Sequence, residues 1–172
     1  MGVHRLNHAV LYVRDVARTV AFYRETLGFA PIEGMDGLPG AAFLRAPGST
    51  NDHDLGLFQI GPAAQDSPAG RTAVGLYHLA WEVDTLAELE RIAQVLADRG
   101  ALVGATDHGT TKALYAKDPD GLEFEVSWLV PAELITPETI ESRTRLAPLD
   151  LAKEQERYGA DTRGGVGVSV PA

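Results

Sequence analysis

The chain has 172 residues, no cysteine, a formal net charge of −9 at pH 7 and 45% hydrophobic residues. This size suits one compact domain, the acidic charge excludes an ordinary nucleic-acid binder, and no apolar run is long enough to span a membrane. Without thiolates, any bound metal would have to use imidazole and carboxylate ligands. Because no secretory signal pattern opens the chain, we expect a cytoplasmic location.

An internal repeat is the most informative feature of the sequence. A shift of 70 residues aligns residues 6–8 with 76–78 and Val13 with Val83. Both segments have the pattern of a strand that ends just before a helix. The repeat places His8 and His78 at equivalent positions.

Each copy continues with a predicted helix. In the first copy, Asp15 can cap the helix and Gly28 can end it, with apolar positions at helical spacing at Val16, Val20, Tyr23 and Leu27. In the second copy, Thr85 and Glu88 form a capping-box pattern and Gly100 ends the helix. Its apolar stripe consists of Leu86, Leu89, Ile92 and Leu96.

Short apolar segments follow each helix, at residues 41–45 and 55–60 in the first copy and 113–116 and 122–129 in the second. Each copy therefore has the pattern of a strand, a helix and about three strands. We predict an α+β fold of two tandem βαβββ modules, residues 1–62 and 73–130, joined by a linker at 63–72 rich in Gly, Pro, Ala and Ser. Residues 131–172 are expected to form a peripheral, partly helical tail, with a short helix within 137–147.

Two histidines and a glutamate are the candidate metal ligands. A single histidine on a strand is usually structural, but the equivalence of His8 and His78 across the repeat favours ligation, because paired modules would bring them face to face. In the second copy, the turn Asp118–Gly121 leads into a strand whose alternation puts Glu123 and Glu125 on one face. Two acidic side chains on one face indicate either solvent or a metal.

The sequence Asp-Pro-Asp-Gly followed by Glu125, four residues after the Gly, resembles the last-strand signature of the vicinal oxygen chelate superfamily. This superfamily includes glyoxalases, fosfomycin-resistance enzymes, bleomycin-binding proteins and extradiol dioxygenases. The resemblance covers residues 4 to about 130. It implies a single domain over 1–130, with the modules forming a curved mixed sheet, or half-barrel, around a metal bound by His8, His78 and Glu125.

Within the superfamily, the residues favour single-domain type I extradiol dioxygenases of the catechol 2,3-dioxygenase kind. Glyoxalase-type sites resemble a four-ligand arrangement, but the inward positions expected for a second carboxylate, within residues 53–59, are apolar. Three protein ligands leave room for a chelating substrate and dioxygen. The resemblance thus implies ring cleavage of a catechol-like substrate, in aromatic compound catabolism, with Fe(II) favoured and Mn(II), Zn(II), Ni(II) or Co(II) as other candidates.

Three more residues resemble parts of extradiol active sites. His53 would act as the acid–base residue beside the oxygen-binding position, while His108, in a His-Gly loop, and Tyr115, ten residues before Glu125, would hydrogen-bond the substrate. The alternative for each is an ordinary loop or strand residue, which the sequence favours less.

Other functions and the assembly state stay open at this stage. The alternatives are a glyoxalase-like isomerase or lyase, a fosfomycin-type thiol transferase, and a metal-free binding protein of the bleomycin-resistance type. The resemblance also implies a homodimer, and the sequence leaves open whether modules pair within one chain or swap between chains.

Overall fold

The computed structural model describes residues 2–35, 37–70 and 72–165. The chain forms two compact units: unit 1 consists of residues up to Ser67 together with Asp118–Gly121, and unit 2 consists of Pro68–Lys117 and the residues from Leu122 onward. The predicted α+β class is confirmed, and the strands form two mixed sheets that are not closed into a barrel. None of the helices in the described ranges is long and apolar enough to cross a membrane.

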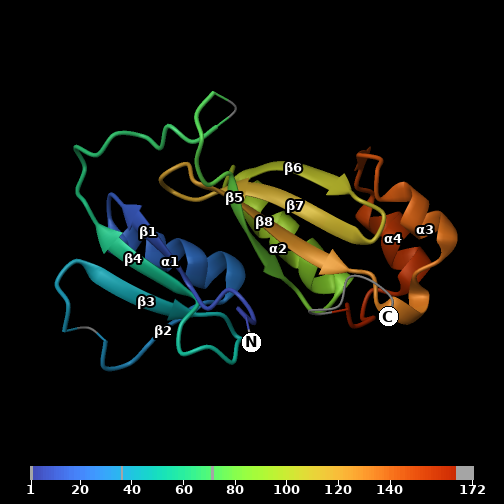
Figure 1. Cartoon of the computed structure of the whole chain (residues 1–172), viewed down its shortest axis with the longest axis horizontal. Helices are drawn as coiled ribbons and strands as arrows, with labels where there is room; N and C mark the ends of the chain where they lie inside the picture. The colour runs from blue at the N-terminus through green and yellow to red at the C-terminus, as the bar shows by residue number, and fades with distance from the viewer. Residues whose placement is uncertain (1, 36, 71, 166–172) are drawn as a thin grey trace. The chain divides into compact units, whose positions relative to one another are not determined.

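Unit 1 has the predicted βαβββ order. Its elements are β1 (Ala9–Val13), α1 (Val16–Leu27), β2 (Ala30–Pro31), β3 (Ala41–Arg45) and β4 (Leu55–Gln59). The sheet order is β1-β4-β3-β2, with β1 parallel to β4 and the other pairs antiparallel (Figure 1). One face of this sheet is buried with α1 along it, and its core comprises Leu11, Val13, Leu44, Leu55 and Leu57.

The buried side of α1 differs from the predicted apolar stripe. Its buried residues are Thr19, Phe22, Tyr23 and Thr26, whereas Val16, Val20 and Leu27 are only partly buried. The two threonines can be buried because each hydroxyl donates to a backbone carbonyl one turn earlier, Thr19 Oγ1 to Asp15 O at 3.0 Å and Thr26 Oγ1 to Phe22 O at 2.6 Å. The predicted helix ends are confirmed, since Asp15 caps α1 and Gly28 ends it with a φ of 75°.

Unit 2 repeats this order and extends it. Its elements are β5 (His78–Glu82), α2 (Leu86–Asp98), β6 (Leu102–Asp107), β7 (Thr111–Lys117), β8 (Glu123–Leu129) and β9 (Ala147–Pro148), in the sheet order β5-β8-β7-β6-β9. The helix α2 is capped by Thr85 and buries the predicted stripe. Along β8, Phe124 and Val126 are buried while Glu123 and Glu125 stay partly exposed, as the alternation predicted.

Residues after β8 contribute structure to unit 2. They form a 3₁₀ turn (Ala132–Leu134), α3 (Pro137–Ser142), β9 and α4 (Leu151–Tyr158), and the predicted short helix within 137–147 corresponds to α3. Strand β9 pairs with β6, α4 packs on α2, and the Trp128 indole donates to Thr162 O at 3.2 Å. The sequence pattern did not predict α4, because its polar residues carry little apolar periodicity. Residues 166–172 of the expected tail lie outside the described residues.

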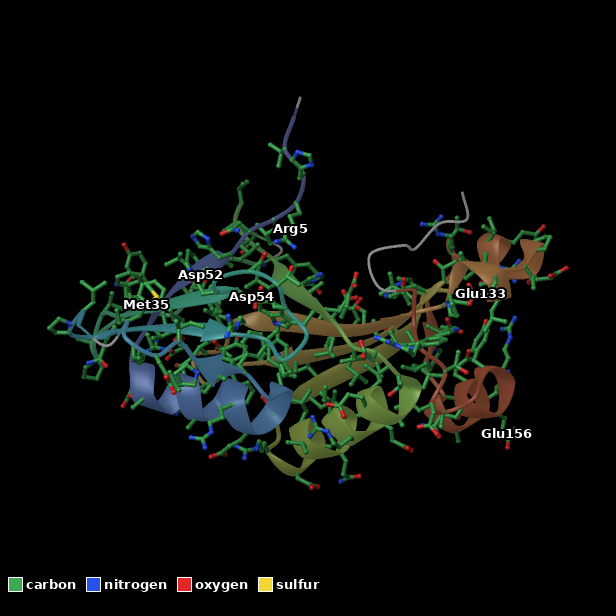
Figure 2. The ribbon with its side chains drawn as sticks, turned by 90° about the horizontal axis from the view of Figure 1, so that it is seen from below. Arg5, Met35, Asp52, Asp54, Glu133 and Glu156 are labelled. Carbon is green, nitrogen blue, oxygen red and sulfur yellow. The ribbon has the colours of Figure 1, made fainter. Side chains whose placement is uncertain are left out.

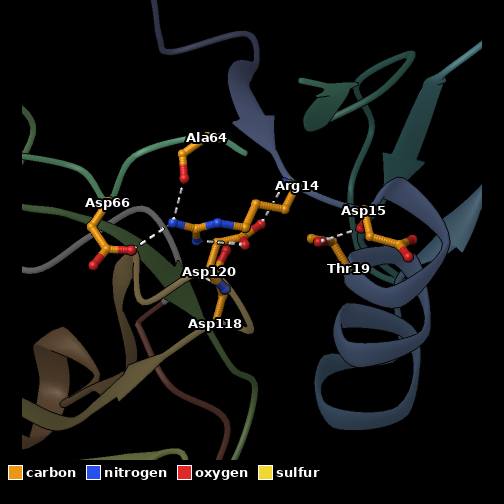
Figure 3. A network of polar contacts seen from close by, with 7 residues as sticks. All are labelled: Arg14, Asp15, Thr19, Ala64, Asp66, Asp118 and Asp120. Atoms are coloured by element: carbon orange, nitrogen blue, oxygen red, sulfur yellow. Dashed lines mark hydrogen bonds and ion pairs between the residues drawn. The ribbon is translucent and has the colours of Figure 1, made fainter. Parts of the chain in front are cut away.

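The turn Asp118–Gly121 belongs to unit 1 although it joins two strands of unit 2. Arg14, after β1, holds this turn: its backbone N–H donates to Asp120 Oδ2 at 2.9 Å and its guanidinium lies 3.0 Å from Asp120 Oδ1 (Figure 3). The same guanidinium contacts Asp66 at 2.5 Å and Ala64 O at 3.0 Å. The pKa of Arg14 is raised, chiefly by its hydrogen bonds to Asp66 and Asp120, so the guanidinium stays charged.

Candidate active site

In unit 2, the strand register brings His78 and Glu125 together. Strand β5 is parallel to β8, with His78 paired to Glu123 and Ala80 to Glu125, so the two side chains are near neighbours on one face. His78 Nε2 lies 3.2 Å from Glu125 Oε2, and the two side chains are 25% and 13% exposed. An imidazole nitrogen and a carboxylate oxygen therefore converge in a partly open position.

The two residues of this pair differ in their other contacts: Glu125 has a further hydrogen-bond partner, whereas His78 Nδ1 has none among the described residues. The Ser127 hydroxyl donates to Glu125 Oε1, which fixes the carboxylate so that its other oxygen faces His78. His78 Nδ1 is buried and has no hydrogen-bond partner among the residues that the structure describes. Nε2, the other ring nitrogen, is the one that faces the Glu125 carboxylate.

Tyr115 and His108 lie beside the pair. Tyr115 is directly opposite Glu125 across β7 and β8, and its ring centroid lies 5.8 Å from that of His78. His108 Nε2 lies 2.8 Å from the Tyr115 hydroxyl oxygen. Burial raises the pKa of Tyr115 to about 12, and the negative charge of Glu125 adds to the effect. At neutral pH the phenol therefore keeps its proton and can donate a hydrogen bond.

In unit 1, His8 and His53 lie together. Their ring centroids are 4.5 Å apart, and the ring of Phe43 is 5.1 Å from that of His53. His8 Nδ1 lies 2.7 Å from Asn7 Oδ1, an acceptor, so Nδ1 is the donor of this contact and Nε2 takes no part in it. His53 Nδ1 likewise lies 2.9 Å from Asp52 Oδ2. Both histidines therefore have a polar side chain that sets their tautomer.

The loop that carries His53 is organised by Asp54, which is only 8% exposed. Its carboxylate accepts hydrogen bonds from Ala46 N, Ser49 Oγ and Asn51 Nδ2 at 2.8, 2.7 and 2.7 Å. Figure 2 labels Asp54 with its neighbour Asp52 on this part of unit 1. A buried carboxylate that accepts three hydrogen bonds has its acceptors satisfied and anchors the loop.

The position in unit 1 that corresponds to Glu125 is occupied by a glycine. In unit 2, Glu125 pairs with Ala80 on β5 and Tyr115 on β7; in unit 1, Gly56 pairs with Val10 on β1 and Phe43 on β3. A Cβ at Gly56 would meet Val10 Cγ2 at 3.4 Å and the Phe43 ring at 3.5 Å. Unit 1 therefore offers no second carboxylate at this position.

The six predicted site residues thus form two groups, each within one unit. His78, Glu125, Tyr115 and His108 lie together in unit 2, and His8 and His53 lie together in unit 1. Over the described residues, neither unit by itself gathers three or more His, Asp or Glu side chains that could hold a metal ion.

Sequence reasoning missed the residues that orient the site. Asn7, Ser127 and Asp107 all contact or support a predicted site residue. For Ser127 a signal existed, since it is two positions after Glu125 and shares its face of β8. Asn7 and Asp107 directly precede candidate histidines, but adjacency alone does not reveal a hydrogen bond.

Comparison with known proteins extends this picture. The profile of the Glyoxalase/Bleomycin resistance protein/Dioxygenase superfamily matches residues 5–126. A catechol-2,3-dioxygenase from Bacillus subtilis (strain 168) is 31% identical over 121 residues, which cover 70% of this chain and 40% of that protein. A metapyrocatechase from Pseudomonas sp. (strain CF600) is 29% identical over 133 residues, covering 73% and 39%. The chain thus spans about two fifths of the length of these curated relatives.

Solved structures show the same fold. A glyoxalase/bleomycin resistance protein/dioxygenase domain from Frankia sp. EAN1pec has a TM-score of 0.57 at 21% identity, covering 73% of this chain and 92% of that chain. The fosfomycin resistance protein FosX from Listeria monocytogenes has a TM-score of 0.54 at 18% identity, covering 73% and 93%. A FosX variant from that organism was determined in complex with Mn(II), at a TM-score of 0.52 and 15% identity, covering 73% and 92%.

Proposed function

Because the chain belongs to the Glyoxalase/Bleomycin resistance protein/Dioxygenase superfamily, we propose that it is a metal-dependent extradiol dioxygenase acting on a catechol-like substrate. The observation that carries the proposal is the convergence of His78 and Glu125 with the protonated Tyr115 and with His108 beside them. The names of the relatives, catechol-2,3-dioxygenase and metapyrocatechase, support the same reaction.

We propose His8, His78 and Glu125 as the ligands of one divalent metal, with Fe(II) as the first candidate and Mn(II), Zn(II), Ni(II) or Co(II) as others. The donor set fits such an ion, because two imidazoles and a carboxylate suit divalent transition metals. Neighbouring ligand atoms about 2.1 Å from one metal lie about 3 Å apart, and the observed separation of His78 Nε2 and Glu125 Oε2 is 3.2 Å. The Asn7 contact leaves Nε2 of His8 available in the same way.

The absence of a side chain at Gly56 supports a site with three protein ligands. Such a site leaves coordination positions for both oxygens of a catechol and for dioxygen. A bound Fe(II) ion would supply the redox chemistry that allows dioxygen to react with an aromatic diol.

The chain's own residues would bind the substrate and move protons. Tyr115 keeps its proton at neutral pH and would donate a hydrogen bond to one substrate oxygen, while His108 holds the Tyr115 hydroxyl in place. His53, with Asp52 at its Nδ1, would present Nε2 as the acid–base group beside the oxygen-binding position. Phe43, at the edge of the His53 ring, would exclude water from that side.

The test begins with the ligands. Metal content and affinity are measured for His8→Ala, His78→Ala and Glu125→Gln, with His4→Ala and Glu123→Gln as matched controls on the same chain segments. We expect each of the first three variants to lose the metal and both controls to retain it. Retention of wild-type affinity by His8→Ala would remove His8 from the site.

Activity is tested by oxygen uptake after anaerobic reconstitution with Fe(II), using a panel of catechols. Stoichiometric uptake with a yellow ring-opened product is expected, and His53→Gln should lower kcat by about 100-fold without loss of metal, the size usual for a general acid or base. Metal bound by the three ligands without oxygen uptake would contradict the dioxygenase proposal and favour an isomerase, lyase or thiol transferase of the same superfamily.

The homodimer and the cytoplasmic location stay predictions. Light scattering of the purified protein, and fractionation of cells that produce it, test them directly.

A further inference from the structure

The segment after β8 lies outside the matched part of the superfamily profile, which ends at residue 126. We infer that this segment positions the active-site turn that carries His108, through α3 pressed on Gly109 and α4 ion-paired to Lys112. The inference rests on the proposed function for the role of His108, but every contact that carries it lies within unit 2.

The first contact is the close approach of α3 to the turn. Gly109 is buried and has a φ of 77°, in the left-handed region that favours glycine. A Cβ at this position would lie 2.7 Å from Thr139 O and 2.9 Å from Arg143 N, and closer still to Ser142 Oγ. The last turn of α3 therefore occupies the space beside Gly109, which holds the residue directly after His108 against the helix.

The second contact is a buried ionic chain. Asp107 Oδ1 accepts a hydrogen bond from Gly109 N at 2.7 Å and lies 2.6 Å from Lys112 Nζ. Lys112 Nζ also lies 2.9 Å from Glu154 Oε2 of α4, and the Lys112 and Glu154 side chains are only 1% and 7% exposed. Because buried charges are costly unless paired, Glu154 is required to keep Lys112, and through it Asp107, in place.

Both contacts meet at the His108 turn. Asp107 and Gly109 flank His108, and the backbone N–H of His108 donates to Thr111 O at 2.9 Å to close the turn. The imidazole then reaches the Tyr115 hydroxyl at 2.8 Å. A displacement of α3 or α4 would therefore change the His108–Tyr115 hydrogen bond before it affected the pair His78 and Glu125. Glu154 and Gly109 are positioning residues in this scheme.

The experiment compares two variants with two matched controls in the full-length chain. Gly109→Ala introduces a side chain against α3, and Gly100→Ala imposes similar left-handed strain, at a φ of 64°, with nothing within 4 Å. Glu154→Gln weakens the ion pair, and Glu156→Gln changes an exposed glutamate of the same helix that points away from the unit (Figure 2). The readout is the ring-nitrogen NMR spectrum of protein labelled with ¹⁵N-histidine, in which five histidines are to be resolved.

We expect Gly109→Ala and Glu154→Gln to shift the His108 ring signals, and to lower kcat by about tenfold at unchanged KM and metal content, whereas both controls match the wild type. Wild-type His108 signals in folded Gly109→Ala and Glu154→Gln would overturn the inference. If Gly109→Ala fails to fold, Glu154→Gln carries the test. The NMR signals need no turnover, so an inactive wild-type enzyme would contradict the proposed function and leave this inference testable.

Discussion

The two units share one strand plan but carry different chemistry on it. At the central position of the sheet, unit 1 has Gly56 opposite Phe43, whereas unit 2 has Glu125 opposite Tyr115. The apolar pair in unit 1 cannot bind a cation or donate a hydrogen bond, while the polar pair in unit 2 can do both. The histidine next to the first strand is present in both units, as His8 directly before β1 and as His78 at the start of β5.

Under the proposed function, this difference would make the metal site asymmetric. In the proposed site, two equivalent histidines and a single carboxylate would be the ligands, and Gly56 offers no side chain as a fourth ligand. Unit 1 also carries His53, the proposed acid–base residue, on a loop held by the buried Asp54. The following predictions test the comparison, from the largest expected effect to the smallest.

The Glu125→Gln substitution removes the negative charge that distinguishes unit 2 from unit 1 at this position. The loss of a residue that only orients a ligand costs about 10- to 100-fold in metal affinity. For the loss of a ligand itself we therefore expect a fall of about 1,000-fold or more. Titration with Mn(II), followed by electron paramagnetic resonance, measures the affinity. Glu123→Gln, on the same face of β8, is the control and should bind as the wild type. Equal losses in both variants would mean that overall charge, and not ligation, controls binding.

Leu57→Ala and Leu114→Ala each remove one core leucine, the first from unit 1 and the second from unit 2; these side chains are 0% and 1% exposed. Each should lower the free energy of unfolding by about 2–5 kcal/mol, through lost burial and the cavity that remains. Chemical denaturation measures both variants, and Val103→Ala, at a residue 52% exposed, should have little effect. A loss in only one of the two variants would show that the units do not contribute equally to the cooperative unfolding transition.

The Tyr115→Phe substitution removes the phenol hydroxyl from the polar pair of unit 2 and leaves a ring of the kind that Phe43 provides in unit 1. The pKa of Tyr115 is raised from 10.0 to about 12 in the folded protein. Between these two pH values the folded state keeps the phenol proton and the unfolded chain loses it. The free energy of unfolding therefore falls as the pH rises through this range. Tyrosinate absorbance of metal-free protein should show a phenol titrating near 12 that Tyr115→Phe lacks.

Substitution of the helix caps should have the smallest effect. Asp15 Oδ1 accepts from Arg18 N at 3.0 Å, and Thr85 Oγ1 accepts from Glu88 N at 3.2 Å. Asp15→Ala and Thr85→Ala should each lower the free energy of unfolding by about 1 kcal/mol, whereas Asp15→Asn and Thr85→Ser, which keep an acceptor, should lower it less. Thermal unfolding compares the two pairs, and equal losses in the alanine and conservative variants would argue against capping.

Much of the fold could be predicted because its signals are local. The caps Asp15 and Thr85, the glycine ends of the helices and the stripe of α2 depend on residues within a few positions of one another. The repeat added long-range information, since it aligned His8 with His78 before any contact was known. The buried side of α1 was predicted only in part: Tyr23 is buried as the apolar spacing indicates, but Thr19 and Thr26 become compatible with burial only through hydrogen bonds to their own helix.

The sequence by itself determined the α+β class, the two modules and the candidate residues, because periodicity, capping and a turn motif are properties of the chain read in order. Only the tertiary structure decided which of these residues meet within each unit. The distance of 3.2 Å between His78 and Glu125 follows from the register of β5 on β8, and the packing of α3 and α4 around the His108 turn follows from contacts between distant segments. Strand register and packing depend on the whole folded unit, and no local pattern encodes them.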